Sequence, residues 1–312
     1  MDKAGERIKM NVEIVGGGYV AGFRSDLGGN CYRLFHEKSG AEILRTPKSE
    51  KELFSEIFLF GNPILFPPNR IRDGRFEFEG RSYAFPVNEA ATGCHLHGAL
   101  YTTPFAVTEK TENSVTFTFH AKYKEYLDFP HSFTMQRSYV LDENGLNECV
   151  EVYNQSNENM PFMLAFHTTL NVPFLKNGNG ADCTLTMPVR REQIRGERYL
   201  PTLEYVGGRE RENALCAGTY HITQNTVSAL YESDGRTTKI TDIKNGVSVC
   251  YEASSEYAYR MLWRGENAAF IVAEPQTCAI DCFHLEKPAT EKGLLVIPPK
   301  TSLKLYTRFY VE

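Results

Sequence analysis

Short runs in which apolar and polar residues alternate recur along most of this chain, and they constrain its fold more than any other feature. In the clearest run, residues 113–123, every second residue from Val115 to Tyr123 is apolar or aromatic, which predicts a strand with one buried face. Similar runs occupy residues 132–141, 146–153, 162–168, 183–187, 227–231, 237–241, 247–251, 257–263, 269–272, 294–297 and 302–311. Turn sequences that tolerate a positive φ, such as Asp234-Gly235 and Asn245-Gly246, separate several of them. The sequence therefore predicts an all-β fold, a large antiparallel β-sandwich that residues 1–312 form as a single domain.

Helical signals are scarce. The best candidate is residues 46–58, where Thr46 can cap a helix, Pro47 suits its first turn and apolar residues recur at helical spacing. We therefore expect one or two short helices on a β body.

Charge and hydropathy argue against several classes of partner. The chain carries 34 basic and 39 acidic side chains, a net charge of -5, so it lacks the electropositive surface that nucleic acids require. No stretch approaches the roughly 18 apolar residues that suggest a membrane span, and the charged first residues do not resemble a secretory leader. We expect a soluble, cytoplasmic protein that binds neither nucleic acid nor membrane.

The eight cysteines are scattered, and several lie inside apolar runs. They indicate small buried side chains in a reducing compartment. Cys278 and Cys282 have C-x3-C spacing, but no second Cys/His pair with zinc-finger spacing accompanies them. No metal site is expected there.

A few polar side chains embedded in strand and turn sequence are candidates for chemistry. Arg70, His97, His167 and Glu274 supply one guanidinium, two imidazoles from separate segments and one carboxylate, the groups that can move a proton onto one oxygen and off another. Alternation would aim His95 and His97 at one strand face, as metal ligands require, but they lack a third matched ligand. Acid–base chemistry on a polar, neutral substrate is the better interpretation.

Several short segments also follow one another in a recognisable order. They are residues 28–34, Asn69-Arg70-Ile71 with Gly74-Arg75-Phe76, Asn88 followed by His97-Gly98, Phe166-His167, and Glu274-Pro275-Gln276-Thr277. In this order the chain resembles the aldose 1-epimerase (galactose mutarotase) family along nearly its whole length. The resemblance implies a galactose mutarotase-like supersandwich that interconverts the α and β anomers of a free aldose without a cofactor.

The resemblance also implies roles for individual residues. Glu274 would be the base on the C1 hydroxyl and His167 the acid toward the ring oxygen, the two facing each other across a groove about one sugar ring wide. His97 would bind the ring oxygen or a neighbouring hydroxyl, and Arg70 would orient the substrate. Gln276, two residues beyond Glu274 on a strand, would share its face and support the carboxylate or reach a sugar hydroxyl.

Other interpretations stay open at this point. Arg70 could instead pair with Asp73 or Glu77, and Trp263 and Phe283 are expected to pack in the core rather than stack on a sugar. His131 and His284 are expected to be structural. The sugar-binding aspartate of the family has only Asp182 and Asp242 as candidates.

Two alternative functions also remain. One is a non-catalytic carbohydrate-binding module. The other is an epimerase for a phosphorylated sugar, with phosphate contacts from a charged loop that contains Arg190, Arg191 and Arg195. The sequence determines neither the sugar nor the oligomeric state.

Overall fold

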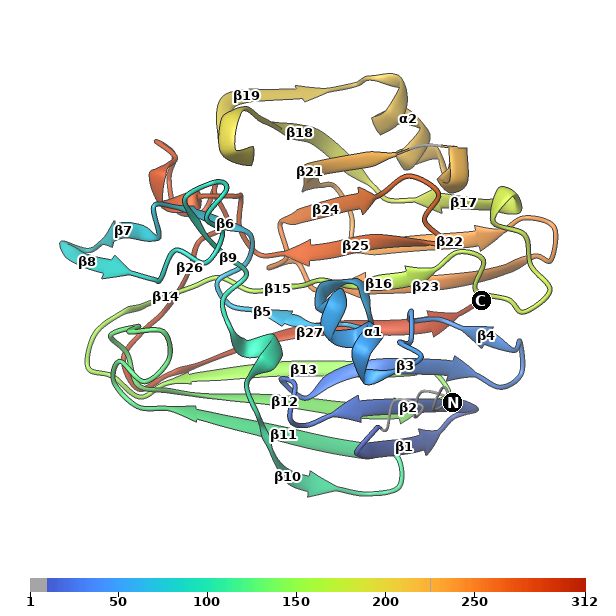
Figure 1. Cartoon of the computed structure of the whole chain (residues 1–312), viewed down its shortest axis with the longest axis horizontal. Helices are drawn as coiled ribbons and strands as arrows, with labels where there is room; N and C mark the ends of the chain where they lie inside the picture. Colours follow the sequence, from blue (N-terminus) through green and yellow to red (C-terminus); the bar gives the residue numbers. More distant parts are fainter. Residues whose placement is uncertain (1–9, 225) are drawn as a thin grey trace, which may run out of the picture.

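The computed structural model describes residues 10–224 and 226–312, and strands dominate it (Figure 1). The largest sheet has nine strands, and each of its ladders is antiparallel. In sheet order the strands are β10 (Ala106–Lys110), β11 (Ser114–Ala121), β12 (Phe133–Asp142), β13 (Gly145–Asn154), β27 (Ser302–Val311), β23 (Val247–Ala253), β22 (Thr237–Asp242), β17 (Cys183–Thr186) and β20 (Tyr220–His221).

Two further sheets lie over the nine-stranded sheet (Figure 1). A four-stranded sheet contains β1 (Val12–Gly16), β2 (Tyr19–Arg24), β3 (Asn30–His36) and β4 (Ala41–Glu42). An eight-stranded sheet runs through β19 (Pro201–Gly207), β18 (Val189–Arg195), β21 (Val227–Ser233), β24 (Tyr259–Arg264), β25 (Phe270–Gln276), β15 (Ala165–Phe166) and β5 (Ile64–Leu65), with β16 (Thr169–Asn171) also paired to β25.

Side chains of β12 join the layers. The ring centroid of Tyr139 lies 4.7 Å from that of Phe23 in β2, and the Arg137 guanidinium lies 5.3 Å from the ring centroid of Phe166 in β15. One hydrophobic cluster of buried residues includes residues of all three sheets. The fold class predicted from strand alternation, a large antiparallel β-sandwich, is confirmed.

Three two-stranded pairs complete the β structure, and two of them approach the site described below. They are β14 (Met160–Phe162) with β26 (Leu295–Ile297), β6 (Arg70–Arg72) with β9 (Cys94–Leu96), and β7 (Arg75–Phe78) with β8 (Arg81–Ala84).

Two short α-helices occur in the described residues, α1 (Glu50–Ser55) and α2 (Glu210–Ala217). The predicted start of the first helix is wrong, because Ser49 rather than Thr46 accepts the capping hydrogen bond, from the Glu52 backbone N–H. The hydroxyl of Thr46 instead donates to the Tyr32 carbonyl. Single 3₁₀ turns are η1 (Ile57–Leu59), η2 (Leu100–Thr102), η3 (Gly180–Asp182), η4 (Glu197–Tyr199), η5 (Ile222–Gln224) and η6 (Cys282–His284).

Most predicted strands lie within a residue or two of the observed ones. The predicted run 269–272, however, ends four residues before β25 does, and there are two further informative errors. The predicted run 162–168 is divided between the end of β14 and the separate strand β15. The expected charged loop around Arg190 is strand β18, whose exposed Arg190 and Arg191 pair with Asp234, just after β21, and with Glu232 of β21.

The cysteines are all free thiols, and six of the eight are buried. Cys149 is half-buried and Cys216 is exposed. Within residues 10–224 and 226–312, no helix is long and apolar enough to cross a membrane. The single-domain boundary at residues 1–312 stays a prediction.

Candidate active site

A cleft of about 790 Å³ opens on one face of the eight-stranded sheet, a volume typical of small-molecule sites. Its floor comes from β18, β21, β24 and β25, and its walls come from the α1–η1 segment, the loops around β6 and β9, and the η4 turn. The lining residues are Phe54, Ser55, Glu56, Ile57, Phe58, Leu59, Asn69, Arg70, Glu89, His97, His167, Arg195, Tyr199, Ser228, Met261, Trp263 and Glu274. Four of the five predicted site residues, from four distant segments, therefore line one cleft.

Glu274 lies on β25, a strand whose seven residues are all buried. Only 3% of Glu274 is exposed, and burial raises the pKa of its carboxyl to about 8. Gln276, on the same strand face, donates from Nε2 to Glu274 Oε2 at 2.9 Å, and this hydrogen bond opposes part of the shift. At neutral pH the carboxyl is poised to exchange a proton.

His167 follows β15 directly, and its backbone N–H donates to the Pro63 carbonyl at 2.9 Å. Its Nε2 lies 3.4 Å from Glu274 Oε1. Burial lowers the pKa of His167 to about 4. The expected gap of one sugar ring between these two groups is wrong, since they are in contact and present themselves together to the cleft.

His97 is fixed by its backbone neighbours. It has a positive φ of 64°, and Gly98 follows because a Cβ at that position would lie 1.8 Å from the Phe66 carbonyl oxygen. The Asn69 backbone N–H donates to His97 Nδ1 at 3.2 Å, and burial lowers the pKa of His97 well below its ordinary value. The neutral ring therefore carries its proton on Nε2, which makes that atom a hydrogen-bond donor.

The ring of Phe58 packs against both imidazoles. Its centroid lies 4.9 Å from that of His97 and 5.6 Å from that of His167. The two histidine rings meet edge to face at 5.6 Å. This packing orients both imidazoles on the same side of the cleft.

Arg70 pairs with Glu89 rather than with Asp73 or Glu77. Its Nε and Nη2 donate to the two carboxylate oxygens of Glu89, each at 2.6 Å. Burial alone would raise the pKa of Glu89, but hydrogen bonds from Arg70 and Thr92 hold it below its ordinary value. The bidentate geometry fixes the guanidinium plane, so Arg70 is a rigid donor in the cleft.

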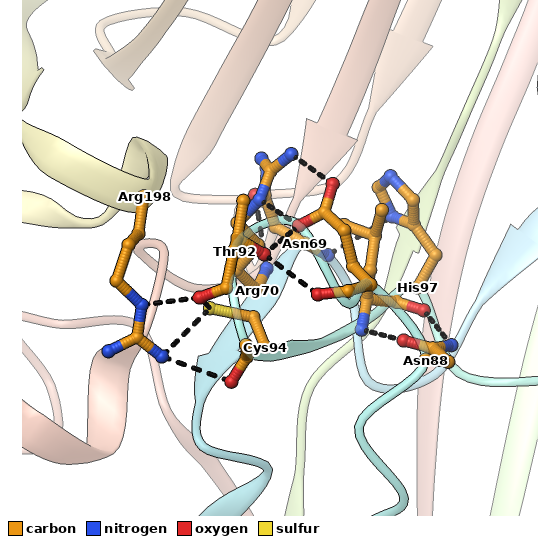
Figure 2. Close-up of polar contacts among 10 residues, drawn as sticks. Asn69, Arg70, Asn88, Thr92, Cys94, His97 and Arg198 are labelled. Carbon is orange, nitrogen blue, oxygen red and sulfur yellow. Dashed lines mark hydrogen bonds and ion pairs between the residues drawn. The ribbon is translucent and has the colours of Figure 1, made fainter.

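A second arginine secures the loop that carries Glu89. Figure 2 shows Arg198, from the η4 turn, reaching across to Thr92 and Cys94. Arg198 Nη2 also donates to the Gly93 carbonyl at 3.0 Å and to Asp73 at 2.6 Å. The neighbouring Tyr199 ring lies 4.7 Å from the Arg70 guanidinium. The η4 turn and the loop thus form one wall of the cleft, which Tyr199 and Glu89 line.

The two aspartates considered for sugar binding are elsewhere. Neither Asp182 nor Asp242 lines the cleft, and Asp242 instead accepts hydrogen bonds within the turn that holds Asn245. Gln276 is fully buried behind Glu274 and is not among the lining residues. It supports the carboxylate, while Glu89 and Arg195 are cleft residues that sequence reasoning did not select as sugar-site residues.

The remaining aromatic and histidine candidates lie either in the cleft or clearly outside it. Trp263 lines the cleft, contrary to the expectation of a core position, whereas Phe283 stacks on Phe76. His95 does not share a strand face with His97, because His97 lies beyond the end of β9. Three other histidines have partners outside the cleft: His95 the Pro86 carbonyl, His131 Tyr83 and Ser156, and His284 Asp281. Within residues 10–224 and 226–312, no three His, Cys, Asp or Glu side chains are grouped as metal ligands.

Comparisons with known proteins agree with this fold. A galactose mutarotase-like protein from Clostridium acetobutylicum is 28% identical, with a TM-score of 0.91 over 96% of this chain and 94% of that one. A galactose 1-epimerase from Lactobacillus acidophilus is 15% identical, with a TM-score of 0.71 over 95% of this chain and 92% of that one, and shares the fold. The uncharacterised Escherichia coli protein YihR is 29% identical over 109 residues, which is 34% of this chain and 35% of YihR. The aldose 1-epimerase family model matches residues 14–310, so the chain belongs to the aldose 1-epimerase family.

Proposed function

We propose that this protein is an aldose 1-epimerase that interconverts the α and β anomers of a free aldose by acid–base ring opening. The observation that carries the proposal is the contact between Glu274 Oε1 and His167 Nε2, 3.4 Å apart in the cleft. The anomeric hydroxyl oxygen and the ring oxygen are bonded to the same carbon, so two adjacent groups can reach both. Family membership supports the same reaction class.

In the proposed reaction one proton leaves the sugar and another enters it. The Glu274 carboxylate takes the proton of the C1 hydroxyl while protonated His167 gives a proton to the ring oxygen. The bond from C1 to the ring oxygen breaks and C1 becomes an aldehyde. Rotation about the C1–C2 bond presents the other aldehyde face, and the reverse transfers close the ring. Both side chains finish in their starting states, so the balance requires no cofactor.

The electrostatics of the pair suit this exchange. With the pKa of Glu274 near 8 and that of His167 near 4, the pair holds one proton at neutral pH, and in the free site that proton lies on Glu274. Gln276 and Arg195 favour the ionised carboxylate, which helps the proton reach His167 when a sugar binds. A pair that holds one proton across the neutral pH range can supply both an acid and a base there, as general acid–base catalysis requires.

The other lining groups have supporting roles in this proposal. His97 donates from Nε2 to the ring oxygen or a neighbouring hydroxyl, and Arg70, held by Glu89, orients the ring. Trp263 and Tyr199 offer aromatic surfaces for the apolar C–H faces of the sugar.

The first experiment measures exchange between the α and β H1 signals of glucose and galactose by NMR. We expect the protein to accelerate exchange, and Glu274→Gln to lower kcat on the order of 10²–10⁴-fold. The matched control is Glu252→Gln, which makes the same side-chain substitution at a carboxylate that pairs with Arg308 outside the cleft. It should leave the rate unchanged.

Failure to accelerate exchange across a broad aldose panel would reject the enzyme. Calorimetric binding of a sugar without exchange would instead support a non-catalytic carbohydrate-binding module.

A further inference from the structure

The charges that line the cleft do not balance. Glu89 neutralises Arg70, and Arg45 pairs with Glu56, with 3.5 Å between Arg45 Nη1 and Glu56 Oε2. Burial keeps Glu274 largely protonated at neutral pH, because its pKa is raised to about 8. His97 and His167 are neutral there, because burial lowers the pKa of each. The remaining charged side chain of the lining is Arg195.

Arg195 stands at the end of β18 and faces the cleft. Its Nη2 donates to the carbonyl and, at 3.0 Å, to the hydroxyl of Ser228. Among the residues that the structure describes, no carboxylate lies within 4 Å of this guanidinium, and its Nε and Nη1 have no hydrogen-bond partner. A guanidinium cannot release its proton at physiological pH, so a partly buried and unpaired one favours an anionic ligand.

The neighbouring arginines of β18 differ from Arg195, because each of them has a carboxylate partner. Arg190 and Arg191 lie on the same strand, and each is paired, with Asp234 at 3.5 Å and with Glu232 at 2.8 Å. Neither lines the cleft. The three arginines expected to converge on a phosphate therefore do not converge, and one positive charge remains where two or three would suit a phosphate dianion.

We propose that Arg195 selects an aldose that carries one negative charge, with a sugar acid such as a hexuronate as the matching class. This inference rests on the proposed anomer exchange and adds the substrate class. The sugar carboxylate would accept hydrogen bonds from Nε or Nη1 of Arg195 while C1 meets Glu274 and His167. Arg195 is a specificity-determining residue in this arrangement.

The test compares kcat/KM for exchange of glucuronate with that of glucose, and of galacturonate with that of galactose. The protein should prefer each acid to its neutral partner, and Arg195→Gln should lower that preference ratio ten- to a hundred-fold, the range of a charge-assisted hydrogen bond. Arg191→Gln is the control, because it removes the same charge from the same strand outside the cleft. Its preference ratio should stay that of the unaltered protein.

Three results would overturn the proposal. The first is a higher kcat/KM for the neutral sugars than for the acids. The second is an equal fall in kcat/KM for acids and neutral sugars in Arg195→Gln, which would mean that Arg195 acts on the ionisation of Glu274 instead. The third is a higher kcat/KM for glucose 6-phosphate than for glucuronate. If Arg195→Gln does not fold, Arg195→Lys keeps the charge but changes its geometry and should retain a reduced preference, whereas an undiminished preference contradicts direct binding by the guanidinium.

The result also separates this inference from the proposed function. If no sugar of either class exchanges, the enzyme proposal fails, and calorimetry then tests Arg195 alone. Glucuronate binding that is tighter than glucose binding and is lost in Arg195→Gln supports the inference. Equal binding of the two sugars, or no binding, rejects it.

Discussion

Two polar clusters of this protein are similarly buried, and they differ in how completely their groups are satisfied. Between the sheets, Arg137 donates to Glu148 at 2.9 Å, to the Gly28 carbonyl at 2.8 Å and to Asn30. The second carboxylate oxygen of Glu148 accepts from Asn62 at 3.2 Å. This inter-sheet cluster has a partner for each charge.

The Glu274–His167 pair is different. Within the described part of the chain, His167 Nδ1 and Gln276 Oε1 are buried without a hydrogen-bond partner of normal geometry. Burial raises the pKa of Glu274 and lowers that of His167, so it favours the neutral form of each group. The comparison teaches that a satisfied polar cluster stabilises one arrangement of the sheets, whereas an incompletely satisfied one leaves groups available to a substrate.

The largest expected effect on stability comes from breaking the satisfied cluster. Arg137→Met should lower the free energy of unfolding by about 3–5 kcal/mol, because it leaves the Glu148 carboxylate buried without its cation. Urea titration measures the change. Arg308→Met, which breaks a half-exposed pair with Glu252, should change it by less than about 1 kcal/mol. Similar losses of unfolding free energy in Arg137→Met and Arg308→Met would contradict the proposed difference between the buried cluster and a half-exposed pair.

A smaller effect of opposite sign is expected in the cleft. In the folded protein Glu274 keeps its proton up to a pKa of about 8, whereas its ordinary value is 4.5. The fold therefore loses stability as pH rises from about 4.5 to 8, and Glu274→Gln, which cannot ionise, avoids this loss. We expect the variant to be more stable than the unaltered protein by at most about 4 kcal/mol at pH 8 and by little at pH 4. Thermal unfolding at the two pH values measures this difference. A destabilised variant at pH 8 would show that the carboxylate is satisfied after all.

Most strands of the fold could be predicted because successive side chains of a strand point to opposite faces of the sheet. A strand with one buried face therefore alternates apolar and polar residues in its own sequence. Residues 113–123 illustrate this, since they contain β11 with Val115 and Phe117 buried. Strand β18 could not be predicted in the same way. Arg190 and Arg191 face water and pair with Asp234, just beyond the end of β21, and with Glu232 of β21, so the local pattern matches that of a charged loop.

The site residues likewise include some that could be predicted from the sequence and some that could not. Glu274 and His167 follow buried apolar runs, and the resemblance to the family identified them. Glu89 and Arg195 lie in polar sequence more than a hundred residues apart and reach the cleft by different routes. Glu89 lies in the loop that Arg198 holds, and Arg195 is the last residue of β18, which pairs with β21. Local sequence carries no signal of either route.

The most direct test of the central claim is the pH dependence of kcat/KM for exchange of a neutral aldose. A Glu274–His167 pair that must hold one proton predicts a plateau between about pH 4 and pH 8, whichever of the two carries the proton. Below the plateau the base is protonated, and above it the acid is lost. The residual activity of Glu274→Gln should lack the limb near pH 8, because the pKa of about 8 belongs to Glu274. A rate that keeps rising above pH 8, or an upper limb unchanged in Glu274→Gln, would contradict the account.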